Sequence, residues 1–240
     1  MFRRRRSQDE PVEPEVDESV VDDELEEDEP ERRVPGPYDE TEVPDDEVVR
    51  LDLGGLRVPG SEGMELRLDL DEETQSIIAV SVVNGDSAIQ LMAFAAPRTE
   101  GIWDDVREEI RVALASQGPV EEAQGVFGKE LLATLPVAGP QGQSGMQPVR
   151  FVGVDGPRWF VRGLLSGPAA RNAEAAAPLE EVLRATVVVR GSDPMAPGDP
   201  LPLQVPGELP EGMHRGGDDA PDRRTPLPPP ERGPEITEIR

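Results

Sequence analysis

The sequence predicts an α+β fold: a mainly antiparallel sheet with two helices packed on one face, flanked by disordered N- and C-terminal tails. Three observations predict it. Several short segments alternate apolar and polar residues, as half-buried strands do. Asn84-Gly85 is a strong signal for a tight hairpin between two of these segments. Two further segments repeat their apolar residues at helical spacing, and this combination is typical of an α+β domain.

The composition divides the chain into three parts. Residues 48–190 hold 43 Leu, Ile, Val or Phe in 143 positions, whereas the other 97 positions hold 15. Only the middle part can bury enough apolar surface to offset its ordering entropy, so we predict one globular domain there. Residues 1–47 carry 20 acidic and 6 basic side chains and are predicted to be a disordered acidic leader. Residues 191–240, with 12 prolines, are predicted to be a disordered Pro/Gly-rich tail.

The first half of the domain is predicted to consist of strands. Val49–Leu53 and Met64–Leu70 alternate apolar and charged residues, as expected of strands with one exposed face. Ile77–Val83 and Ser87–Ala95 are apolar on both faces and are joined by Asn84-Gly85. We therefore expect these two segments to be central strands, with one face under a helix.

The clearest helix is predicted at Trp103–Leu114, which begins with acidic residues and is followed by Gly118-Pro119. Val120–Phe127 and Glu130–Val137 resemble short strands, and Gly139–Gln147 resembles a flexible loop.

The second half of the domain predicts another hairpin, a helix and a closing strand. Val149–Val154 and Trp159–Leu165 flank the turn Asp155-Gly156-Pro157. A helix is expected at Pro178–Arg184, preceded by a looser turn at 169–177, and Thr186–Arg190 is expected to be the last strand.

The composition argues against most catalytic chemistry. The chain has no cysteine and one histidine, which excludes thiol nucleophiles and disulfides and disfavours catalytic triads and histidine metal sites. Ala123–Glu130 resembles a phosphate-binding loop, but Glu130 stands where a hydroxyl should hold magnesium, so a simple turn is favoured. We therefore predict no enzyme activity, no cofactor and no metal.

The candidate binding surface is aromatic and basic. Trp159 lies between Arg158 and Arg162 near a predicted turn, and Trp103 opens the first helix. Because the domain has few aromatic residues, the alternative is that both tryptophans belong to the core.

A family resemblance supports this reading. The acidic leader, the Ile77–Ala95 hairpin, the stretch GVDGPRWFVRG at 153–163 and LRATVVVRGSDP at 183–194 resemble a family of uncharacterised actinobacterial proteins, a domain of unknown function. The resemblance covers residues 45–205 and implies a cytoplasmic protein without assigned activity. The order of elements is also similar to that of PsbP/Mog1-like α+β domains, which by itself says nothing about function.

We therefore expect a non-enzymatic binding or adaptor protein that docks a protein partner. The acidic leader would attract a partner that is basic. The alternative is a small-molecule or lipid-binding domain with a pocket between the sheet and the helices. The net charge of −26 disfavours direct binding of nucleic acid. No segment predicts export or a membrane span, so we expect a cytoplasmic location. The sequence does not indicate an oligomeric state.

Overall fold

The computed structural model describes residues 36–71, 74, 76–98, 101–138, 144–205 and 214–215. The disorder predicted for residues 1–35 and for most of 206–240 lies outside these described residues. Among them, no helix is long and apolar enough to cross a membrane.

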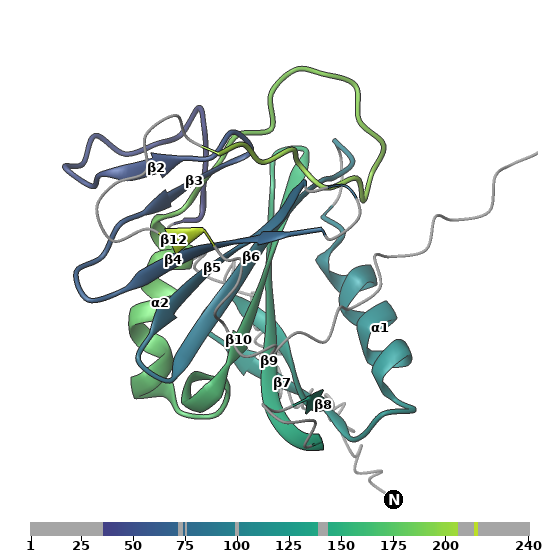
Figure 1. Ribbon diagram of the computed structural model, residues 1–240. Coiled ribbons are helices and arrows are strands. Elements are labelled where there is room, and N and C mark those ends of the chain that lie inside the picture. The colour runs from purple at the N-terminus through teal and green to yellow at the C-terminus, as the bar shows by residue number, and fades with distance from the viewer. Residues whose placement is uncertain are drawn as a thin grey trace, which may run out of the picture. The chain divides into compact units, whose positions relative to one another are not determined.

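Two β-sheets and two α-helices form the fold (Figure 1). The predicted α+β class and mainly antiparallel pairing are confirmed; β1 with β11 and β4 with β12 are the parallel pairs. The smaller sheet contains β1 (Tyr38–Asp39), β2 (Arg50–Asp52), β3 (Leu56–Pro59) and β11 (Val187–Val188), in the order β1-β11-β3-β2. The larger sheet contains β4 (Glu65–Leu70), β5 (Ile77–Asn84), β6 (Ser87–Ala95), β7 (Val120–Gly125), β8 (Gly128–Ala138), β9 (Ser144–Gly156), β10 (Trp159–Ser166) and β12 (His214–Arg215), in the order β12-β4-β5-β6-β10-β9-β8-β7.

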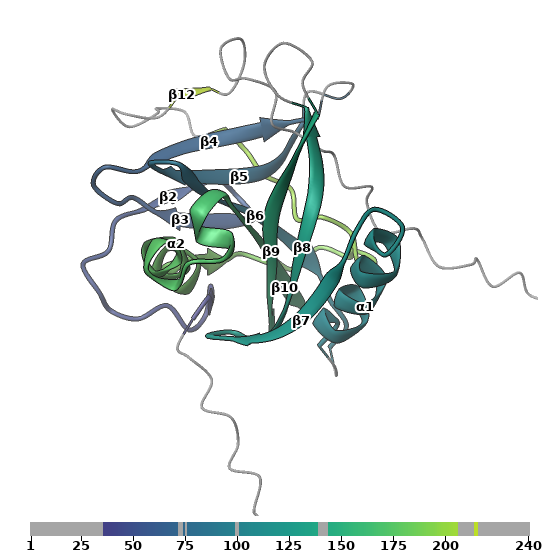
Figure 2. The same cartoon turned by 90° about the horizontal axis from the view of Figure 1, so that it is seen from below.

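The helices α1 (Trp103–Leu114) and α2 (Ala173–Ala185) lie on opposite faces of the larger sheet, not on one face as expected (Figure 2). Alternation along β6 gives the reason. Leu91 and Ala93 pack in the cluster that contains α2, whereas Phe94 packs in the cluster that contains α1. Since successive strand residues point to opposite faces, a strand that is apolar on both faces needs a cover on each. The smaller sheet shares the α2 cluster through Leu53, Leu56, Val58 and Val188.

The helix α2 begins five residues before the predicted start. Asn172 is its N-cap, and the Asn172 side-chain oxygen accepts hydrogen bonds from the amides of Glu174 (2.8 Å) and Ala175 (3.2 Å). Pro178, which we placed in the first turn, lies inside the helix. An asparagine that satisfies two free amides is a stronger start signal than a proline.

A carboxylate from the β9–β10 hairpin caps α1. The N-cap residue Ile102 has no capping side chain, but Asp155 Oδ1 accepts hydrogen bonds from the amides of Ile102 (2.8 Å) and Trp103 (3.2 Å). Asp155 thus stabilises the positive end of the helix from a distant part of the sequence.

The folded region extends beyond both predicted boundaries, 48 and 190. On the N-terminal side, β1 pairs with β11, and Asp39 accepts a 2.8 Å hydrogen bond from Trp159 Nε1. On the C-terminal side, residues 191–205 follow β6 and the start of β3 through backbone hydrogen bonds, such as Leu201 N to Ala93 O (2.8 Å), and Leu201 is buried. Backbone pairing therefore retains segments whose few apolar residues predicted disorder.

The remaining differences are local. The segment with the phosphate-loop-like pattern is the β7–β8 hairpin, in which Ala123 pairs with Glu130 and Lys129 is exposed. Residues 144–147, predicted to belong to a flexible loop, are the first residues of β9.

Candidate functional site

A surface depression of about 210 Å³ lies where the last turns of α2 meet the end of β3. Its walls come from three separate segments, which the smaller sheet brings together. The lining residues are Val48, Pro59, Gly60, Ser61, Glu181, Val182 and Ala185. Because the strand order places β2 at the edge of that sheet, the depression borders an edge strand, a common place for a partner chain to bind.

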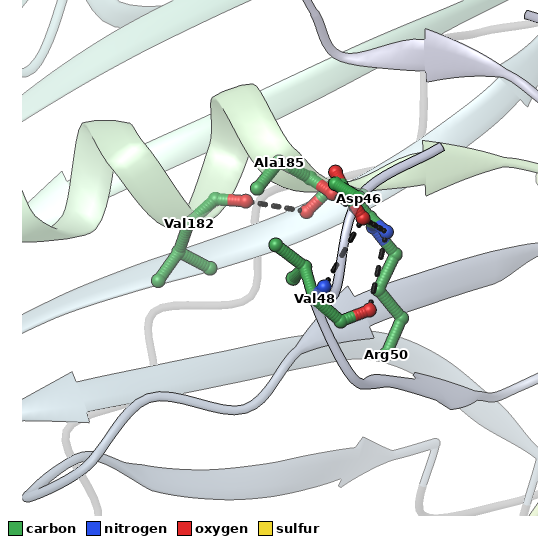
Figure 3. A network of polar contacts seen from close by, with 6 residues as sticks. Asp46, Val48, Arg50, Val182 and Ala185 are labelled. Carbon is green, nitrogen blue, oxygen red and sulfur yellow. Dashed lines mark hydrogen bonds and ion pairs between the residues drawn. The ribbon is translucent and has the colours of Figure 1, made fainter. Parts of the chain in front are cut away.

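Arg50 fixes one wall of this depression (Figure 3). Its Nε donates to the carbonyl of Ala185 at 2.7 Å, and Nη1 and Nη2 donate to the two oxygens of Asp46, each at 2.8 Å. The hydrogen bond with Asp46 raises the pKa of Arg50, and the same bond lowers the pKa of Asp46. The guanidinium therefore caps the C-terminal end of α2, and its charge is neutralised within the protein.

Apolar side chains stand exposed beside the depression. Val49 is 83% exposed and Val48 is 42% exposed. Val49 was predicted to face inward with Leu51 and Leu53, but β2 begins only at Arg50, so the alternation does not extend to it. An apolar pair that protein does not cover, beside a depression, is typical of an interaction surface. The sequence signal was the Val48-Val49 pair itself, which breaks the alternation.

The surroundings of these valines are acidic. Glu40, Glu42, Asp45 and Glu47 are exposed on the segment that leads to β2, and Glu181 lies on the rim of the depression. Residues 36–205 contain 28 acidic and 13 basic side chains. Five of the arginines have largely buried side chains, namely Arg50, Arg107, Arg150, Arg162 and Arg190. Asp39, Glu130 and Glu180 are buried as well, so the charge that faces solvent stays predominantly negative, as the composition suggests.

A second cluster of charges is buried between α2 and the larger sheet. Arg150 on β9 donates to Glu180 on α2 (Nη2 to Oε1, 2.6 Å) and to Glu130 on β8 (Nη1 to Oε1, 3.3 Å). Burial raises the pKa of Glu130, and the nearby Arg150 opposes that shift. The other carboxylate oxygen of Glu130 is buried and has no hydrogen-bond partner in the described part of the chain. This cluster links α2 to the sheet, and none of its members lines the depression.

The candidate surface proposed from the sequence is not formed, because both tryptophans are core residues. Trp159 is 1% exposed and Trp103 is 5% exposed, and they belong to the clusters on opposite faces of the sheet. Each indole N–H has a partner inside the protein, Asp39 for Trp159 and the carbonyl of Lys129 for Trp103, each at 2.8 Å. The alternative, that the tryptophans are structural, therefore describes their positions correctly.

The two arginines of that surface also lie apart. Arg158 occupies the β9–β10 turn with a φ of 65° and is half-buried. Arg162 lies on the α1 face of β10 and is 9% exposed. Because neighbouring residues of a strand point to opposite faces, Trp159 and Arg162 cannot share a surface.

Both tryptophan rings pack closely against glycines of the larger sheet. The Trp103 ring lies directly on Gly153, where an added Cβ would lie 2.2 Å from a ring atom. The Trp159 ring lies on Gly156 in the same way, at 2.1 Å. Within the described residues, no group of three or more His, Asp or Glu side chains is placed to hold a metal ion.

Comparison with known proteins gives one family. The family model described as "Protein of unknown function (DUF3710)" matches residues 36–212, a range that begins where the described fold begins and includes the segment after β11. Neither the curated proteins nor the solved structures gave a match.

Proposed function

The chain belongs to the DUF3710 family of proteins of unknown function, and we propose that this member is a non-enzymatic, cytoplasmic binding or adaptor protein. The proposed docking surface consists of Val48 and Val49, the depression beside them and the acidic segment 40–47. The observation that carries the proposal is the exposure of two adjacent valines beside a depression at a sheet edge.

The chemistry of this surface favours a protein partner with basic and apolar side chains. The valines offer apolar contact area, and an apolar side chain of modest size would fit the depression. Carboxylates surround the valines, while the nearby Arg50 is bound to Asp46 and to α2. A basic partner would thus meet unneutralised negative charge, which speeds association and disfavours acidic partners.

The acidic leader would add to this attraction. Residues 1–35 carry 14 acidic and 6 basic side chains and precede the docking surface in the chain. Negative charge on an adjoining segment increases the rate of encounter with a basic partner and makes that rate depend on salt.

Photo-cross-linking tests the proposal directly. A photoreactive amino acid replaces Val49 in the full-length protein, and the matched control carries it at Val112, a 61% exposed valine on α1. We expect a discrete protein adduct, of basic composition, from position 49 and not from position 112. Val48→Asp should reduce the yield of that adduct. Identical adducts at both positions, or none at position 49, would contradict the proposal.

A truncation tests the role of the leader. The deletion must end at residue 35, because a deletion through 47 would remove β1 and the Asp39–Trp159 hydrogen bond. We expect the shortened protein to give the same adduct from position 49 more slowly and with weaker dependence on salt. An unchanged rate and salt dependence would remove the leader from the proposal and leave the docking surface in place.

A further inference from the structure

Arg162 is a buried cation that has no anionic partner among the described residues. Its guanidinium donates from Nη2 to the Met92 sulfur at 2.9 Å, and its Cζ lies 5.6 Å from the centre of the Phe94 ring. Among the residues that the structure describes, no carboxylate lies within ion-pairing distance of it. A thioether is a weak acceptor and an aromatic ring offers only a partial counter-charge.

Three other buried arginines have carboxylate partners, and Arg190 donates to the backbone carbonyl of Asp193 at 3.1 Å. Arg50 is bound to Asp46, Arg107 to Asp104, and Arg150 to Glu180. Acidic residues outnumber basic ones by about two to one in residues 36–205, so carboxylates are plentiful. The isolation of Arg162 is therefore a property of its position and not of the composition.

The acidic side chains on the same face of the sheet are bound elsewhere. The registers place Asp155 on β9 and Asp69 on β4 on the face that carries Arg162. Asp155 accepts from the first amides of α1. Asp69 Oδ2 accepts from Ser81 (2.6 Å) and Gln90 (2.8 Å). Neither carboxylate is positioned to pair with Arg162.

Burial lowers the pKa of Arg162 to about 10, which leaves it charged at neutral pH. A buried charge is costly unless it is paired, so an unpaired arginine favours the arrival of an anion. Within the described residues the guanidinium donates only to the Met92 sulfur, through Nη2, which leaves Nε and Nη1 to donate to another acceptor.

We infer that Arg162 binds an oxyanion group, a carboxylate or a phosphate, of a small-molecule ligand at the edge of α1. Nε and Nη1 donate to the oxyanion, and Met92 and Phe94 hold the guanidinium in place. Trp103, which lies on Gly153 directly opposite Arg162 in the sheet, borders the site. The inference is independent of the docking surface, which lies beside α2.

The test uses full-length protein and three sodium salts at equal ionic strength: phosphate, acetate and chloride. Tryptophan fluorescence reports on Trp103 near Arg162, and thermal unfolding reports on ligand-induced stability. We expect phosphate or acetate, but not chloride, to produce a saturable fluorescence change and a rise in Tm. Arg162→Met keeps the packing volume and should weaken the apparent affinity at least tenfold. The control is Arg171→Met, which changes an exposed arginine and should leave the affinity unchanged.

The responses to the three salts distinguish a carboxylate ligand from a phosphorylated one. Saturation by acetate indicates a carboxylate ligand, and saturation by phosphate indicates a phosphorylated one. A linear response that is equal in the wild type and Arg162→Met would be a general salt effect and would overturn the inference. Should Arg162→Met not fold, the Arg162 Nε–H signal of the wild type is followed by NMR instead. A saturable shift of that signal supports the site, and its absence overturns it.

Discussion

Two glutamates share Arg150, and replacing each by glutamine should have opposite consequences. The Arg150–Glu180 contact is short, at 2.6 Å, and joins α2 to the sheet. The Arg150–Glu130 contact is longer, at 3.3 Å, and the second oxygen of Glu130 is buried without a partner in the described region. With all three groups ionised, the cluster holds one positive and two negative charges, so one negative charge is uncompensated.

The magnitudes follow from this imbalance. Removing one member of a buried ion pair costs about 3–5 kcal/mol when the other is left alone. Glu180→Gln leaves Glu130 to pair with Arg150, so we expect a smaller loss of unfolding free energy than that range, about 2–3 kcal/mol. Glu130→Gln removes the uncompensated charge and preserves the shorter contact. We therefore expect stability between unchanged and about 1 kcal/mol higher at pH 7.

The dependence on pH supplies an independent check. Burial raises the pKa of Glu130 in the folded state, so the folded protein holds that proton more tightly than the unfolded chain does. The stability contributed by the protonated form is fully present below the unfolded-state pKa and is lost as pH rises through the folded-state pKa. The advantage of Glu130→Gln over the wild type should therefore shrink as the solution is acidified.

Urea unfolding followed by tryptophan fluorescence, at several pH values between 4 and 8, measures these differences. Equal m-values would show that the variants unfold from comparable states. The reasoning is refuted if Glu130→Gln is destabilised at pH 7 as much as Glu180→Gln, since the two carboxylates would then be equivalent.

Three further substitutions test the supports of the fold. Asn172→Ala should cost about 1 kcal/mol of unfolding free energy by removing the α2 cap, measured by urea unfolding against Gln124→Ala, an exposed position on β7, as the control. Gly153→Ala should cost about 1–3 kcal/mol or more, because its Cβ would overlap the Trp103 ring, and should alter the near-UV circular dichroism. Asp39→Ala should cost about 1–3 kcal/mol by leaving Trp159 Nε1 buried without an acceptor; an unchanged Tm would remove β1 from the stable fold.

Strand patterns along the chain were informative because their evidence is local. The Ile77–Ala95 hairpin and the helix beginning at Trp103 lie where alternation, Asn84-Gly85 and the helical repeat predict them. Because β6 is apolar on both faces, its sequence also indicated that each face of the sheet is covered. The prediction of two helices on one face did not take this into account. Local patterns thus indicate the faces of a strand before they indicate what covers each face.

The pairing of segments that lie far apart in the chain could not be predicted from local sequence patterns. Gly36–Glu47 contains a single exposed valine and six acidic residues, yet its β1 strand pairs with Val187-Val188 from the other end of the domain. Likewise, residues 191–205 are retained by backbone hydrogen bonds such as Gly55 N to Pro202 O, at 3.0 Å. Such backbone hydrogen bonds depend on which strand edges remain free in the fold, and the amino-acid composition does not reveal those edges. The exposure of Val49 was missed for a related reason, since it depends on where β2 begins.

The surface beside Val48 and Val49 is acidic because the fold leaves carboxylates exposed there while several arginines are paired or buried. Arg50, Arg107 and Arg150 turn their charges toward carboxylates inside the fold or close to its surface, and Arg162 is buried without one. These four cations are removed from the surface while Glu40, Glu42 and Glu47 stay exposed. The solvent-facing charge beside Val48 and Val49 is therefore predominantly negative, and under the proposed function it would attract a basic partner over a range set by salt. Attraction alone is unspecific, and under the proposed function the valines and the depression would supply the short-range complementarity that makes one basic partner preferable to another.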